Sequence, residues 1–135
     1  MSPNQPTTGK LKVLVVEDDQ FLQKILLLKF AAEGFEVSGA ADGEEALKRI
    51  LAEAPNIVLL DLILPKMNGF DVLTEIRTNP QTRQLPVVVL SNLGQEEDIR
   101  RARNLGALDF LVKSDVSIQE IVQRVKESFV QNVGK

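Results

Sequence analysis

The 135-residue sequence contains no histidine, cysteine, tryptophan or tyrosine. Without cysteine the chain forms no disulfide and no thiolate metal site, which is typical of a reducing compartment. Without histidine it lacks the commonest general base, and this excludes Ser-His-Asp and Cys-His catalysis as well as zinc bound by imidazole. Any chemistry must therefore use carboxylates, hydroxyls, lysine amines and a metal bound through oxygen.

Long apolar runs and an excess of positive charge are also missing. No run approaches the ~18 residues that a membrane-spanning helix needs. The formal net charge is −3, which gives no general attraction to nucleic acid. Residues 1–10 contain Pro, Asn and Thr but no apolar run, and they predict a disordered tail rather than a signal peptide. We therefore expect a cytoplasmic protein with no membrane contact and no direct nucleic-acid contact.

Short apolar runs alternate with amphipathic stretches along the whole chain. The apolar runs predict β-strands over 11–16, 35–40, 56–60, 85–91 and 108–112. The stretches between them predict helices over 20–33, 43–54, 69–78, 95–105 and 118–130. Boundary signals agree: Asp19 is expected to cap the first helix, Gly34 follows it, and Ser117 and Glu120 form a capping box before the last.

Strict alternation of strand and helix predicts an α/β fold with a parallel sheet. Right-handed crossovers leave few topologies for five such units. The flavodoxin-like, doubly wound (βα)5 fold is favoured, with strand order 2-1-3-4-5 and helices on both faces of the sheet. One domain over residues 11–131 accounts for the pattern.

Polar side chains follow the predicted strands at their carboxyl ends, where sites gather in such folds. Glu17 and Asp18 follow the first strand, Asp61 the third, Ser91 ends the fourth and Lys113 follows the fifth. Carboxylates packed together repel one another unless a cation lies among them, and Mg²⁺ prefers such oxygen ligands. A carboxylate beside Mg²⁺ is a possible nucleophile toward phosphorus, and an amine and a hydroxyl would stabilise the phosphoryl oxygens.

Four segments, "VLVVEDD", "IVLLDLILPKMNGFDVL", "LPVVVLSNLG" and "GALDFLVKSD", resemble the signature segments of response-regulator receiver domains. The resemblance is to chemotaxis-regulator-like, stand-alone members of two-component signalling systems, and the receiver part of a larger regulator is the alternative. It implies that Asp61 is the phospho-acceptor. It also implies that Mg²⁺ is bound by Glu17, Asp18, Asp61 and the backbone carbonyl of Ile63.

The same resemblance assigns the remaining roles. Lys113 and Ser91 would assist the reaction, and Ser91 and Phe110 would form the switch that reports phosphorylation. The phosphoryl donor would be a histidine kinase or a histidine phosphotransfer protein. A downstream protein would bind the face formed by the fourth helix, the fifth strand and the fifth helix, and a homodimer is a candidate assembly. The only reactions expected are phosphotransfer to the domain itself and autodephosphorylation, so no separate substrate is expected.

Three departures from the family pattern bear on the rate of the reaction and on the surface that a downstream protein would bind. Glu17 replaces the commoner Asp, Asn92 replaces a small residue after Ser91, and Ser114 replaces a proline after Lys113. We expect the apolar Ile63 and the bulkier Asn92 to hinder the hydrolytic water and so to lengthen the lifetime of the aspartyl phosphate.

Three other functions fit less well. A Mg²⁺-dependent phosphatase with an aspartyl-phosphate intermediate typically carries a second Asp two residues after the nucleophile, where this chain has Ile63. A receiver used only for protein contact would not need the complete set of polar residues at the strand ends. A flavin or nucleotide domain would need a glycine-rich loop after the first strand, and none is present.

Overall fold

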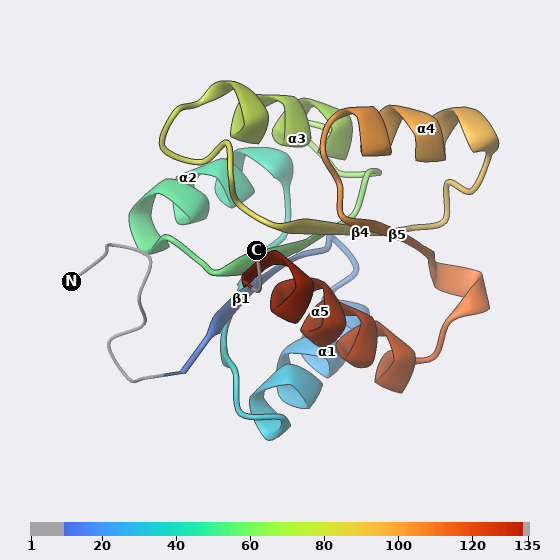
Figure 1. The fold of residues 1–135 in the computed structure, drawn as a ribbon. Coiled ribbons are helices and arrows are strands. Elements are labelled where there is room, and N and C mark those ends of the chain that lie inside the picture. The colour runs from blue at the N-terminus through green and yellow to red at the C-terminus, as the bar shows by residue number, and fades with distance from the viewer. Residues whose placement is uncertain (1–9, 134–135) are drawn as a thin grey trace.

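A computed structural model describes residues 10–133 of the chain, with side chains through Phe129 (Figure 1). The predicted tail over 1–10 therefore lies almost entirely outside the described residues. The elements are β1 (Lys12–Val16), α1 (Gln20–Ala32), β2 (Glu36–Ala40), α2 (Gly43–Glu53), β3 (Ile57–Leu60), α3 (Gly69–Thr78), β4 (Val87–Ser91), α4 (Glu96–Asn104), β5 (Asp109–Val112), a 3-10 turn η1 (Lys113–Asp115) and α5 (Ile118–Val133). No helix within the described range is long and apolar enough to cross a bilayer.

The five strands form one parallel sheet in the order β2-β1-β3-β4-β5, which confirms the predicted topology. Helices α2, α3 and α4 cover one face of the sheet, and α1 and α5 cover the other (Figure 1). Because both faces are covered, every residue of β3 and β4 is buried. The predicted strands and helices are all present, and their ends differ from the prediction by a few residues at most.

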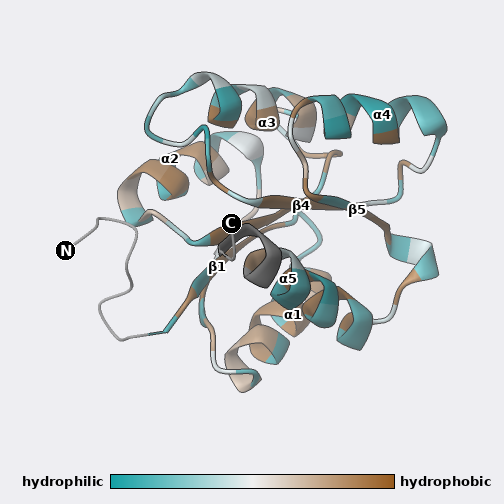
Figure 2. Ribbon diagram, in the orientation of Figure 1, coloured by the Kyte–Doolittle hydropathy of each residue, from teal (hydrophilic) through white to brown (hydrophobic). Residues whose placement is uncertain are grey.

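The core has two halves, one on each side of the sheet. Alternate residues of β1 point in opposite directions. Leu14 and Val16 pack with residues of α2, α3 and α4, whereas Val13 and Val15 pack with residues of α1 and α5. Figure 2 shows apolar strands in the middle of the fold and a mostly hydrophilic α4, whereas α1 and α2 contain many apolar residues. The sheet is therefore a rigid platform, and its carboxyl edge holds the loops that carry the polar residues.

The helix-boundary predictions are confirmed by hydrogen bonds. The Asp19 carboxylate accepts from the N–H groups of Phe21 and Leu22 at the start of α1. Ser117 Oγ accepts from the Glu120 N–H, and the Glu120 carboxylate accepts from the Ser117 N–H, as a capping box requires. These caps satisfy N–H groups that have no partner inside the helix.

Arg77, near the end of α3, joins three parts of the fold through contacts that were not predicted from the sequence. Its Nε donates to the Leu105 carbonyl at 3.0 Å and one Nη to the Gly106 carbonyl at 2.9 Å, just after α4. The other Nη donates to the carbonyls of Arg83 at 3.2 Å and Leu85 at 2.7 Å, before β4. The guanidinium thus satisfies carbonyl groups at the end of α4 and in the loop that leads into β4.

We expect Arg77→Ala to lower the free energy of unfolding by about 2–3 kcal/mol, since four carbonyls lose a charged donor and two of these hydrogen bonds are partly buried. The measurement is urea denaturation followed by far-UV circular dichroism, because the chain has no tryptophan or tyrosine. The control is Arg83→Ala, whose exposed side chain makes no hydrogen bond among the described residues and should change stability by less than about 0.5 kcal/mol. Equal effects of the two substitutions would contradict this assignment.

Candidate functional site

Two buried carboxylates lie side by side at the carboxyl edge of the sheet. Val16 of β1 pairs with Leu60 of β3, so Glu17 and Asp61, the next residue in each chain segment, emerge together. The Asp61 N–H continues the ladder by donating to the Val16 carbonyl at 3.1 Å. Glu17 is only 2% exposed and Asp61 only 4%. Charges this deeply buried need compensation.

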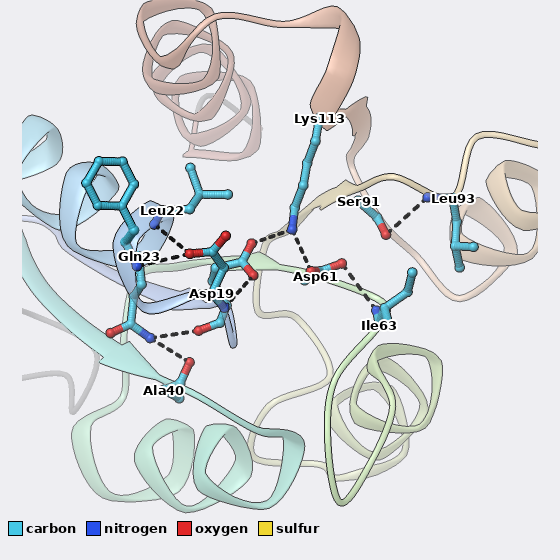
Figure 3. Close-up of polar contacts among 11 residues, drawn as sticks. Asp19, Leu22, Gln23, Ala40, Asp61, Ile63, Ser91, Leu93 and Lys113 are labelled. Carbon is cyan, nitrogen blue, oxygen red and sulfur yellow. Dashed lines mark hydrogen bonds and ion pairs between the residues drawn. The ribbon is translucent and has the colours of Figure 1, made fainter.

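Lys113, which follows β5, supplies that compensation. Its Nζ donates a hydrogen bond to Asp61 Oδ2 at 2.8 Å and lies 2.6 Å from Glu17 Oε1 (Figure 3). The second contact is an ion pair only, because Glu17 Oε1 has no hydrogen-bond partner of acceptable geometry. One cation therefore lies between two acids that come from different strands.

Burial and pairing act against each other on these groups. Burial raises the pKa of the Glu17 carboxyl above its ordinary value, although the contact with Lys113 and the hydrogen bond from the Asp19 N–H partly oppose the rise. Burial by itself would lower the pKa of the Lys113 ammonium, but the contacts with Asp61 and Glu17 outweigh it and raise the pKa. Lys113 is thus held in its charged form.

The same acids could hold a metal ion. Glu17, Asp18 and Asp61 each offer a carboxylate oxygen, and these oxygens lie within 4.8 Å of one another. Asp18 is exposed, so the cluster opens to solvent on its side. The oxygen-only ligand set and the buried Glu17 Oε1, which lacks a hydrogen bond, fit a hard divalent cation such as Mg²⁺. For the carbonyl of Ile63 the ligand role stays a prediction.

The other predicted site residues differ in how far they are buried. Ser91 is fully buried at the end of β4, and its Oγ accepts from the Leu93 N–H at 3.4 Å. The Ile63 N–H donates to Asp61 Oδ1 at 3.2 Å, while the Ile63 side chain is 54% exposed (Figure 3). Phe110 on β5 is half-buried against the core on the α4 side, and Asn92 is exposed.

Gln23 was missed by the sequence analysis. Its side-chain amide contacts the backbone beside Glu17 (Figure 3). A glutamine in a helix carries no chemical signal in a single sequence, and only the folded geometry brings this one to the acidic loop.

Fold and site together define a flavodoxin-like α/β domain with an acid-lysine cluster at the sheet edge. The family model of the response regulator receiver domain matches residues 13–126. The chain therefore belongs to the response regulator receiver domains.

Individual relatives agree with this membership. The transcriptional regulatory protein CpxR of Klebsiella pneumoniae is 41% identical over 115 residues, which cover 85% of this chain and 47% of that protein. The receiver domain of the Francisella response regulator 1452 superimposes with a TM-score of 0.83 at 30% identity, covering 90% of this chain and 98% of that one. The phosphorylated cyanobacterial phytochrome response regulator RcpA superimposes with a TM-score of 0.76 at 32% identity, covering 92% of this chain and 94% of that one. The chain spans about half the length of the first curated relatives that it matches.

We expect Lys113→Met to lower the free energy of unfolding by about 3 kcal/mol without divalent metal, because it leaves two buried carboxylates without their cation. Addition of Mg²⁺ should restore part of the loss. The matched control is Lys126→Met, since Lys126 pairs with Glu33 at the surface and such pairs contribute about 0–1 kcal/mol. Urea denaturation with and without Mg²⁺ measures both, and similar small losses in the two variants would contradict the role given to Lys113.

Proposed function

We propose that this receiver domain accepts a phosphoryl group on Asp61 from a phosphohistidine of a histidine kinase or a histidine phosphotransfer protein. The observation that carries the proposal is the pairing of buried Asp61 and Glu17 through Lys113 at the carboxyl edge of the sheet. Family membership supports it, because receiver domains act with such donors in two-component systems.

The chain's own residues suit an attack on phosphorus. A carboxylate oxygen of Asp61 forms the new P–O bond while the P–N bond to the donor breaks, and the imidazole leaves and takes a proton from solvent. Lys113 Nζ, already 2.8 Å from Asp61 Oδ2, is placed to pair with a phosphoryl oxygen. When bound by Glu17, Asp18 and Asp61, Mg²⁺ would neutralise charge on the phosphoryl group. Later attack by water would return Asp61 and inorganic phosphate, so no separate substrate is consumed.

A second group of residues would convert phosphorylation into a change of the protein surface. Ser91 Oγ makes one long hydrogen bond to its own loop, so it is free to turn toward a phosphoryl oxygen. Half-buried Phe110 would move inward as the Ser91 loop shifts and change the surface formed by α4, β5 and α5. A downstream protein or a second copy of the domain would read that surface. The net charge of −3 favours a protein partner over nucleic acid, and the cytoplasm is the proposed location.

The direct test is the intact mass of the protein after incubation with acetyl phosphate, with and without Mg²⁺. We expect one phosphoryl adduct in the wild type that depends on Mg²⁺, and none in Asp61→Asn, which keeps the shape but loses the nucleophilic charge. The control Asp71→Asn changes an exposed acid in α3 and should form the adduct normally. Equal adducts in Asp61→Asn and wild type would refute the assignment of Asp61. Absence of any adduct, also with a phosphohistidine donor, would favour a domain that acts only by contact.

The lifetime of the aspartyl phosphate tests the roles expected of Ile63 and Asn92. We expect Ile63→Asn and Asn92→Ala each to speed loss of the phosphoryl group by about threefold to tenfold, or about 0.7–1.4 kcal/mol in activation free energy, because each opens a path for water. The time course of dephosphorylation after removal of the donor measures the rate. Leu28→Asn on α1 is the control, since it also replaces an exposed apolar side chain. Unchanged or slower loss in both test variants would end this interpretation.

A further inference from the structure

Gln23 lies on the first turns of α1, and its side-chain amide spans the carboxyl ends of β1 and β2. Its Nε2 donates to the Glu17 carbonyl at 3.0 Å and to the Ala40 carbonyl at 2.9 Å (Figure 3). Both partners are carbonyl oxygens, which only accept, so the amide nitrogen must face them. The Glu17 N–H also donates to the Ala40 carbonyl at 3.0 Å. The Ala40 carbonyl thus accepts hydrogen bonds both from the backbone just after β1 and from the Gln23 side chain.

The glycine beneath this amide provides a second, independent observation. A Cβ added at Gly39 would lie 2.7 Å from Gln23 Oε1 and 2.8 Å from its Cδ. The amide therefore occupies space that a side chain on residue 39 would need. Gly39 does not have a positive φ, so the glycine is explained by the close approach and not by backbone conformation.

The peptide group that Gln23 holds is the one that joins Glu17 to Asp18. Glu17 has further restraints, because its Oε2 accepts from the Asp19 N–H and its Oε1 pairs with Lys113. Asp18 has none of these: within residues 10–133 its side chain makes no hydrogen bond and no ion pair. The region that the exposed Asp18 carboxylate can reach therefore depends on its backbone, and Gln23 holds the peptide group that leads into that backbone.

We propose that Gln23, seated on Gly39, is a positioning residue that orients the Glu17–Asp18 peptide and so holds both carboxylates in place for a divalent cation. The inference rests on the proposed function, since it concerns the same Mg²⁺ site. Hydrogen bonds outside the ligand shell commonly change metal affinity by about 10–100-fold. Gln23 acts through Glu17 and Asp18 and touches neither the metal nor the phosphoryl group.

The test is the dissociation constant of Mg²⁺ for the whole chain, measured by isothermal titration calorimetry without a phosphodonor. We expect Gln23→Ala to raise this constant by about tenfold. Gly39→Ala should raise it in the same direction by displacing the amide, and it should add little in the Gln23→Ala background, where the amide is already gone. Gln123→Ala, at an exposed position in α5, is the matched control and should leave the constant unchanged.

A second readout separates positioning from general damage. With acetyl phosphate, Gln23→Ala should need more Mg²⁺ for half-maximal phosphorylation, while its rate at saturating Mg²⁺ stays within about twofold of wild type. An unchanged dissociation constant in Gln23→Ala and Gly39→Ala, with wild-type binding intact, would overturn this inference alone. Absence of Mg²⁺ binding by the wild type would overturn the proposed function and the inference together.

Discussion

The pairing of one lysine with two buried acids is the interaction on which the site depends. Glu17 and Asp61 are almost fully removed from water, and Lys113 Nζ lies within 2.8 Å of an oxygen of each. Two carboxylates at that depth are costly to desolvate unless a cation pairs with them. The arrangement also leaves these groups able to change partners. A divalent ion would pair with the same carboxylates, and a phosphoryl oxygen would pair with Lys113.

The sheet makes this pairing possible. In a parallel sheet all strands end at one edge, so residues 52 positions apart in the chain, Asp61 and Lys113, meet without any insertion or special loop. The two-sided core holds the strand ends in register. Around this rigid edge, the polar contacts come from backbone N–H groups and from side chains of α1 and the connecting loops. The elements that would carry a signal, α4 and β5, begin or end beside the same edge.

Much of the fold and of the candidate site could be predicted from the sequence, because the patterns that indicate them are local. Apolar runs, capping residues and glycines define the elements, and strand order follows from the handedness of crossovers. Glu17, Asp61 and Lys113 were predicted to converge because each follows a strand. Gln23 and Arg77 could not be predicted, since their partners are backbone carbonyls and no sequence pattern marks an acceptor that every residue has. The exact partners of Lys113 also required the folded geometry.

The most direct test of the central claim is the location of the phosphoryl group. After phosphorylation by a phosphohistidine donor with Mg²⁺, reduction with borohydride converts an aspartyl phosphate to homoserine, and peptide mass spectrometry then identifies the position. We expect homoserine at residue 61 and at no other aspartate, and its loss when Mg²⁺ is removed. Modification at another residue, or homoserine at position 61 to the same extent without Mg²⁺, would contradict it.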